Sequence, residues 1–170
     1  MKKIILSLFT LTLILMASCS NNATDAIDEV NKTMNLPFIL ALSEKDLEYG
    51  DEYERANGFG GYTLRKDGLM FWVSGWPDVV DDYHVTEYRF TDDKYTVFNI
   101  SVGNTLNDAV SIMEKNGYSR DKEEESFHGN SMYIFQKNEQ VRISLQVNGD
   151  DQIAEIWVTA IATNKDNVVF

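Results

Sequence analysis

Apolar and polar positions recur with two different periods along this chain, and each period predicts a different kind of element. Between residues 105 and 117 apolar side chains return every three or four positions, as on the buried face of a helix. Thr105 precedes this stripe and Asp108 follows three residues later, which resembles a capping box. Gly117 is suited to the left-handed conformation that closes many helices. The pattern therefore predicts a helix over residues 106–116 that needs a sheet to cover.

Strict alternation predicts the strands. In Val141–Val147 every second side chain is aliphatic, and Arg142, Ser144 and Gln146 lie between them, as in a strand with one apolar face. Asn148-Gly149 follows this run and is a strong hairpin signal. The stretch 69–73 is apolar at every position, which favours a strand buried on both faces. The predicted strands are 62–64, 69–74, 85–91, 95–102, 131–136, Val141–Val147 and Ile153–Ala160.

The first half of the chain shows the same order of elements as the second. One helix is expected near residue 25, and a second is expected to begin at Asn35. Acidic stretches at 48–61 and 119–130 are expected to be loops. A shift of 70 residues aligns Asn35 with Thr105, and a shift of 68 aligns residues 87–91 with 155–159. Such periodic order is what tandem repeats leave in a sequence.

We therefore predict an α+β fold of two tandem helix-plus-antiparallel-sheet repeats of αβββ type. The first repeat spans residues 25–102, the second spans 103–162, and a tail follows at 163–170. Residues 103–110 form a helix start of the pattern G-x-T-x-x-D-A-V, and Gly117-Tyr118 ends the helix. With a sheet to follow, this chain resembles the β-lactamase-inhibitor-protein-like group, which includes the small outer-membrane assembly lipoproteins. The resemblance implies a protein that binds other proteins through its sheet and is not an enzyme, but it assigns no functional residue.

The first residues are predicted to be a targeting signal. Lys2 and Lys3 precede an apolar run at 4–16 that has the length of a signal-peptide core. Ala17-Ser18-Cys19 then resembles the lipobox of bacterial lipoproteins, whose Cys carries acyl chains such as palmitate. We expect residues 1–18 to be a signal peptide, Cys19 to be lipidated and 19–24 to be a tether, which anchors the protein to a membrane of the bacterial cell envelope on the extracytoplasmic side. A cleaved signal peptide without lipid and an N-terminal anchor helix are the alternatives.

Composition limits the chemistry and the partners. Cys19 is the only cysteine, so the mature chain has no disulfide and no nucleophilic thiol. The formal net charge is −12, and removal of Lys2 and Lys3 leaves 13 basic against 27 acidic residues, or −14. A surface this acidic repels phosphate backbones, so nucleic acid is not expected as a partner.

The best candidate surface is one face of the sheet in the second repeat. Alternation in its last three strands is expected to place an aliphatic face under the helix and to present aromatic and polar side chains on the other face. Rigid aromatic groups ringed by polar ones are typical of protein-binding surfaces. The predicted partner-binding residues are Tyr133, Phe135, Arg142, Gln146, Glu155 and Trp157. Cover by the first repeat, by the tail or by a second subunit is the alternative for this face.

The leading hypothesis is therefore a non-catalytic, lipid-anchored module that binds a protein or peptide. The alternative is a sensor for a small ligand or cation, built on the loop 78–84, which contains Asp78, Asp81, Asp82 and His84. This loop matches no calcium-binding pattern and His84 has no second His at ligand spacing, so no metal is expected. The chain has no nucleophile elbow, phosphate loop or zinc helix, so neither an enzyme nor a cofactor is expected.

Overall fold

The computed structural model describes residues 26–76, 79–121, 125–127 and 129–161, and for residues 76, 79–82 and 125–127 it describes the backbone alone. The expected signal peptide, the lipidated Cys19, the tether and the tail 163–170 lie outside the described residues.

The described chain forms one antiparallel sheet of nine strands with two α-helices, so the α+β class is confirmed. Neighbouring strands follow the order β1-β2-β3-β4-β9-β8-β7-β5, and β6 pairs with β7. The strands are β1 Glu54–Gly58, β2 Gly61–Lys66, β3 Leu69–Trp76, β4 Val79–Phe90, β5 Ser119–Arg120, β6 Glu125–Phe127, β7 Asn130–Lys137, β8 Val141–Val147 and β9 Ile153–Ala160. The helices are α2 Ala26–Thr33 and α3 Leu106–Lys115, and a 3-10 helix spans Glu44–Asp46.

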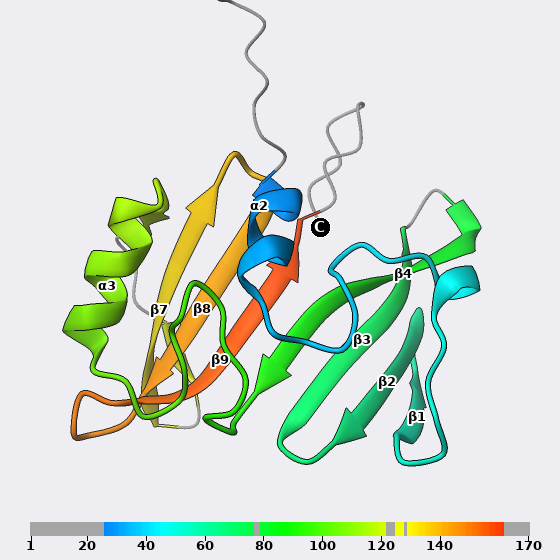
Figure 1. The fold of residues 1–170 in the computed structure, drawn as a ribbon, viewed down its shortest axis with the longest axis horizontal. Coiled ribbons are helices and arrows are strands. Elements are labelled where there is room, and N and C mark those ends of the chain that lie inside the picture. Colours follow the sequence, from blue (N-terminus) through cyan, green and yellow to red (C-terminus); the bar gives the residue numbers. More distant parts are fainter. Residues whose placement is uncertain (1–25, 77–78, 122–124, 128, 162–170) are drawn as a thin grey trace, which may run out of the picture.

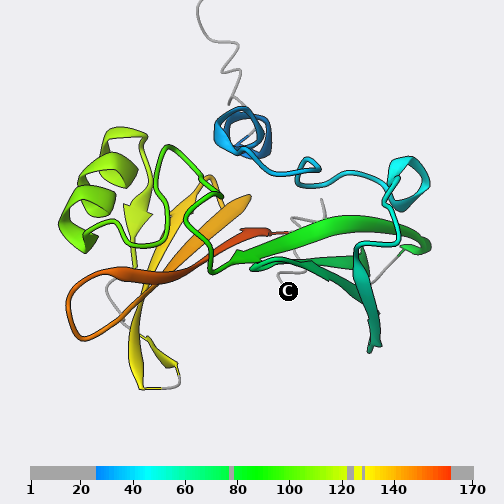
Figure 2. The ribbon, with the colours of Figure 1, turned by 60° about the horizontal axis from the view of Figure 1, so that its bottom comes forward.

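The helices and the long connections lie on one face of the sheet. α3 lies over the second-half strands, whereas α2 and the segment 34–53 lie over the middle and the first half (Figure 1). Figure 2 shows that the sheet is curved and that no described helix lies on the opposite face. We call these two sides the covered face and the uncovered face.

The core lies between the covered face and the elements above it. One row of paired residues crosses six strands on this face. Its members, each 0% exposed, are Leu64, Phe71, Tyr88, Val158, Ile143 and Phe135. Because successive side chains of a strand point to opposite faces, the residues before and after each of these belong to the uncovered face.

The helix predicted from the 105–117 pattern is confirmed as α3. The Thr105 hydroxyl accepts a hydrogen bond from the Asp108 backbone N–H at 3.3 Å and donates one to Asp108 Oδ2 at 2.7 Å. Gly117 adopts φ 78°, which turns the chain so that the following Tyr118 N–H reaches the Met113 carbonyl oxygen at 3.1 Å. The fully buried residues Ala109 and Met113 form the inner face of the helix. Local capping therefore determines both ends of α3.

The helix expected to begin at Asn35 is wrong, because residues 34–53 contain no α-helix. The Asn35 side chain does not cap a helix but bridges to the chain at residues 94 and 96, donating to the Lys94 carbonyl oxygen at 2.7 Å and accepting from the Thr96 N–H at 2.6 Å. Ala41 then adopts φ 66°, which a continuous helix forbids. Tertiary hydrogen bonds override the local helix signal here.

Aromatic packing holds the segment 34–53 on the sheet in place of a helix. The Phe38 ring packs against the rings of Phe71 and Tyr53, with centroids 5.4 and 6.3 Å apart. Tyr88 from β4 donates a hydrogen bond to the Phe38 carbonyl oxygen at 2.8 Å. Leu40 is buried, and the Asn31 side chain satisfies both its backbone N–H and its carbonyl oxygen. The segment thus supplies apolar cover without regular structure.

Other strand and loop predictions also need correction. Residues 95–102 form no strand, because Phe98 and Asn99 adopt φ 53° and 61° and make a tight turn between Val97 and Ile100. Their apolar pattern reflects burial, since Val97, Phe98 and Ile100 are all core residues. The expected loop 78–84 belongs largely to β4, and the acidic stretches contain β1, β5 and β6. The alternation of apolar and polar residues does not identify these strands, because their residues are mostly polar.

Contacts from α2 fasten the first half of the chain to the second. The Gln140 side chain accepts a hydrogen bond from the Ala26 N–H at 2.9 Å. Lys137 Nζ donates to Glu29 Oε2 at 2.5 Å and to the Asn116 carbonyl oxygen at 2.8 Å. α2 is therefore held at the β7–β8 turn (Figure 1). Neither described helix is long and apolar enough to cross a membrane.

Buried tyrosines are expected to set the alkaline limit of stability. Burial raises the pKa of Tyr62, Tyr88 and Tyr118 above the ordinary value of 10.0. The unfolded chain therefore loses these protons first, so the stability that they contribute is complete below about pH 10 and falls as the pH rises further. In urea titrations at a series of pH values, the free energy of unfolding of Tyr88→Phe should fall less steeply above about pH 10 than that of the wild type. At neutral pH the variant should be less stable by about 1 kcal/mol, because it loses a hydrogen bond. Exposed Tyr49→Phe is the control, and equal slopes for wild type and Tyr88→Phe would contradict the assignment.

Candidate functional site

Two neighbouring rows of side chains cross the middle of the uncovered face. Residues paired between strands lie on the same face, so the strand register places these side chains beside one another. The first row, from β2 to β7, is Arg65, Met70, Arg89, Trp157, Ser144 and Ile134. The second row is Thr63, Trp72, Glu87, Thr159, Arg142 and Gln136. We call these twelve residues the cross-strand surface. Thr63, Ser144 and Ile134 among them are buried, Arg65 is exposed and the other eight are partly buried.

A cluster of four side chains ties β4 to β9 at the centre of this surface. The Arg89 guanidinium lies over the Trp157 ring, 3.7 Å from its centroid. Arg89 Nε donates to Glu87 Oε1 at 2.5 Å, and Thr159 Oγ1 donates to Glu87 Oε2 at 3.2 Å. The cation–π contact and the charge-assisted hydrogen bonds hold the indole in one orientation and compensate the two charges. These contacts therefore hold the side chains at the centre of the surface in fixed positions.

Trp72 provides a second fixed indole, nearer to the β1 edge. Its ring reaches across β2 to Gly58 on β1, where an added Cβ would lie 2.6 Å from Trp72 Cη2. Glycine in this strand leaves the space that the indole occupies. A rigid aromatic group that is only partly buried offers contact area at little entropic cost on binding.

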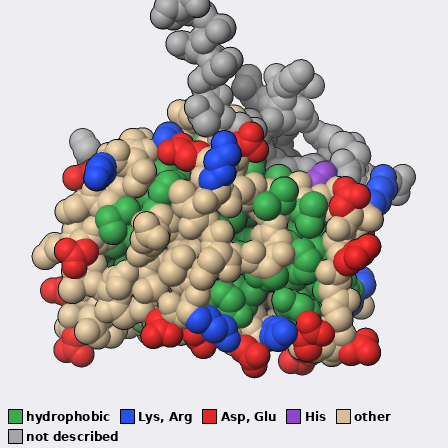
Figure 3. Space-filling model, in the orientation of Figure 1, with side chains coloured by type: hydrophobic (Ala, Val, Ile, Leu, Met, Phe, Trp, Pro, Cys, Tyr) green, Lys and Arg blue, Asp and Glu red, His purple; other side chains and the backbone are tan. Residues whose placement is uncertain are grey.

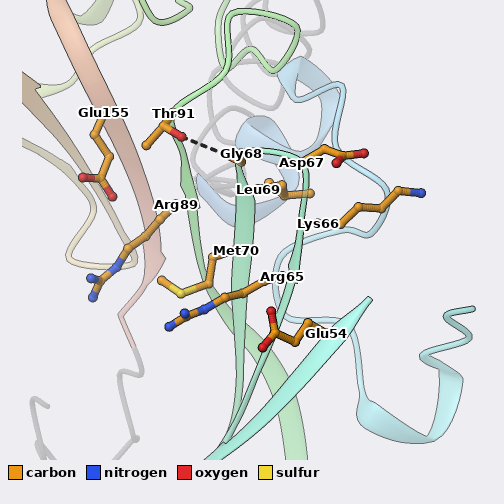
Figure 4. Close-up of a pocket in the computed structure, with 10 residues that line it drawn as sticks. All are labelled: Glu54, Arg65, Lys66, Asp67, Gly68, Leu69, Met70, Arg89, Thr91 and Glu155. Atoms are coloured by element: carbon orange, nitrogen blue, oxygen red, sulfur yellow. Dashed lines mark hydrogen bonds between the residues drawn. The ribbon is translucent and has the colours of Figure 1, made fainter. Parts of the chain in front are cut away.

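A groove of about 350 Å³ opens at the β2–β3 turn end of the same face (Figure 4). The side chains of Arg65, Met70 and Arg89 project to the same side of the sheet in Figure 4, and Glu155 points toward them from β9. Lys66 points away from this group. The groove therefore combines an apolar floor at Met70 with guanidinium and carboxylate groups around it.

Arg142 lies on the other side of the central cluster, on β8. Its cross-strand neighbours are Thr159 and Gln136, and neither supplies a negative charge. Arg142 Nε is buried, and within the described part of the chain it has no hydrogen-bond partner. This donor is an unusual feature, because buried polar groups are nearly always hydrogen-bonded.

The structure brings together four of the six residues predicted from the sequence and separates the other two. Arg142, Gln146, Glu155 and Trp157 share the uncovered face. The prediction that Tyr133 and Phe135 belong to the same face is wrong, because they pair with Leu145 and Ile143 on the covered face. Strand β7 is apolar on both sides, so alternation alone does not determine which side is buried.

Sequence reasoning missed most of the residues that the first half contributes. Met70 and Trp72 were expected in a strand buried on both sides, yet they are only partly buried on the uncovered face, while Leu69, Phe71 and Val73 enter the core. Arg65 and Arg89 carried no signal of their own. Arg89 occupies an alternating position in the predicted strand 85–91, whereas Arg65 lies one residue beyond the predicted strand 62–64. The register that brings the two arginines together depends on tertiary pairing.

The loop proposed for a small ligand or cation does not form as expected. Residues 79–84 belong to strand β4, where His84 pairs with Ser74 and forms a bridge to Ser43. The side chains of Asp78, Asp81 and Asp82 lie outside the described part. Among the side chains that are described, no group of three or more His, Cys, Asp or Glu residues could hold a metal ion.

Charge is distributed unevenly over the molecule. Acidic side chains gather along the rim of the covered face (Figure 3). The chain has 15 Lys and Arg residues against 27 Asp and Glu residues. Of its five arginines, three lie on the cross-strand surface, whereas Arg55 and Arg120 pair with Leu64 and Phe135 on the covered face. Three of the five arginines therefore lie on the uncovered face.

Comparison with protein-family models, with curated proteins and with solved structures found no match.

The two faces of β7 can be distinguished by stability measurements. Phe135→Ala should lower the free energy of unfolding by about 3–5 kcal/mol, because it empties a fully buried position in the core row. The adjacent Gln136→Ala, on the uncovered face, should cost less than about 1 kcal/mol. Urea unfolding of soluble residues 24–170 measures both. Equal losses would contradict the assignment of faces.

Proposed function

We infer that this protein is a non-catalytic, lipid-anchored binding module of the bacterial cell envelope, which holds a protein or peptide against the uncovered face of its sheet. The cross-strand surface is the observation that carries this proposal. It presents two fixed indoles, Trp72 and Trp157, among guanidinium, hydroxyl and amide groups. Aromatic and arginine side chains contribute most of the binding energy at protein interfaces, and their prior ordering reduces the entropic cost of association.

We further propose that the fold consists of two tandem αβββ-type repeats of the β-lactamase-inhibitor-protein-like kind. The strand order supports this, because each half adds its strands from an edge toward the middle, where β4 meets β9. The shift of 68 residues aligns Arg89 with Trp157, and these two residues are paired across β4 and β9. Equivalent residues of two antiparallel strands oppose each other only at a two-fold axis. The Arg89–Trp157 contact would then lie on the axis that relates the repeats.

The sequence at the N-terminus supports the anchor. If Cys19 carries the lipid, only residues 20–25 separate it from Ala26 at the start of α2. An extended chain spans at most about 3.5 Å per residue, so α2 would lie within about 25 Å of the lipid. The binding face would therefore operate close to the membrane surface, on partners that are themselves in the envelope.

Binding at the uncovered face is tested by site-specific photo-crosslinking in cells. A crosslinking amino acid in place of Met70 should capture a protein partner, because Met70 lies in the groove of the cross-strand surface. The control is the same amino acid in place of Ile39, which is 53% exposed on the segment that lies over the covered face. Immunoblotting detects the adducts. Adducts of equal yield and identity from both positions would remove the uncovered face as the binding site.

The anchor is tested by metabolic labelling. Wild-type protein should incorporate a palmitate analogue and sediment with membranes, whereas Cys19→Ser should lose the label, since no other cysteine is present. Ser18→Ala serves as the matched control, because it keeps the thiol and a small residue before it. An unlabelled wild-type protein would favour the simple signal peptide instead.

A further inference from the structure

We propose that Arg142 binds an acidic side chain of the partner and that Arg65 binds a second one on the far side of the same surface. This inference rests on the proposed function, because it states the chemistry of the partner held there. The partner is an extended protein segment that carries Asp or Glu at two positions.

Arg142 takes no part in the ion pairs found among the described residues. Arginine cannot lose its proton in a protein, and all of its hydrogen-bonding groups are donors. Its buried Nε–H has no acceptor within the described residues. A buried donor without a partner is costly, and a partner's carboxylate that accepted from the part of the guanidinium left exposed would supply the missing counter-charge.

The row of the cross-strand surface that contains Arg142 has no free carboxylate to pair with its guanidinium. Glu87 is the acidic member of the row that contains Arg142. Both of its oxygens are already engaged, Oε1 by Arg89 and Oε2 by Thr159. The central cluster therefore satisfies Arg89 and leaves Arg142 to an acceptor from outside.

Arg65 provides the second anchor at the opposite end of the surface. It is exposed on β2, beside Met70, and takes no part in the ion pairs found among the described residues. Its side chain extends into the groove in Figure 4. Glu54 lies directly opposite Arg65 across β1 and β2, and both Glu54 and Glu155 border the groove. A partner's carboxylate must therefore align with the guanidinium and compete with Glu54, which gives the contact selectivity.

The sheet determines the spacing that the partner must match. Four strand steps separate β8 from β2 in the order β8-β9-β4-β3-β2. At about 4.8 Å per step this is about 20 Å, which an extended segment covers in about six residues. Side chains six positions apart point to the same side of such a segment. Two acidic residues at positions i and i+6 would therefore reach both arginines while the side chains between them contact Met70, Trp72 and Trp157.

Charge complementarity favours this occupant over a second copy of the same chain. The mature chain would carry a net charge of −14, so two copies repel each other. The proposed segment needs two carboxylates opposite Arg142 and Arg65 but no overall negative charge, so it does not meet the repulsion that acts between two copies of this chain. Pairing with these two arginines directs the partner to one orientation.

The test uses the full-length lipidated protein in its native membranes, with a photo-crosslinking amino acid in place of Gln136, next to Arg142. Arg142→Glu should reduce the yield of partner adduct at least tenfold, and Arg142→Met should also reduce it. Arg120→Glu is the matched control, because it makes the same charge change on β5 at the covered face and should leave the yield within twofold. Arg142→Met also serves if Arg142→Glu fails to fold, as judged by thermal unfolding.

Mass spectrometry of the adduct identifies the contact. We expect the crosslinked partner segment to contain two acidic residues six positions apart, and replacement of one of them by Lys should restore capture by Arg142→Glu. Adducts that persist in both Arg142 variants would overturn this inference while leaving the proposed function intact. Adducts to residues 162–170 of the same chain, to a second copy or to phospholipid would also overturn it. If neither Met70 nor Gln136 yields an adduct, the proposed function fails as well.

Discussion

The pairing of β4 with β9 is the constraint on which the rest of the molecule depends. Four residue pairs join the two halves of the chain into one sheet. Tyr88 opposite Val158 continues the core row across the junction, and Arg89 opposite Trp157 forms the centre of the uncovered face. A slip of one residue would turn each of these side chains to the other face, which would bury a guanidinium and expose the core. One register therefore determines stability and the candidate binding surface together.

The covered face uses two different solutions to the same physical problem. Over the second half, α3 presents a regular apolar stripe that local capping positions. Over the first half, an irregular segment does the same through Phe38, Leu40 and their hydrogen bonds to distant parts of the chain. α2 then reaches across to the β7–β8 turn. Because the cover crosses the junction, it reinforces the pairing of β4 with β9 and supports the curvature of the sheet beneath it.

The composition of the uncovered face follows from the alternation of side chains along each strand. Alternation sends one set of side chains into the core and presents the other set together on one surface. Arg89 and Glu87 compensate each other there, while Arg142 and Arg65 do not share in that pair. The cross-strand surface carries three arginines and one glutamate, a formal charge of +2, on a chain whose net charge is −12, so it differs from the rest of the protein in charge as well as in aromatic content. Both differences support the binding role that we propose for this face.

The sequence by itself determined the elements whose signals are local. Capping and periodicity predicted α3, and alternation with turn residues predicted β8 and β9 to the residue. Four of the six candidate residues also fell on one face, since alternation within a strand is a local property. Tertiary structure decided the rest. No helix begins at Asn35, because the Asn35 side chain is hydrogen-bonded to backbone groups 59 and 61 residues away. Strand pairing also decides which face of β7 is buried. It also united Arg65 and Arg89 with Arg142, because register between strands depends on contacts that no local pattern encodes.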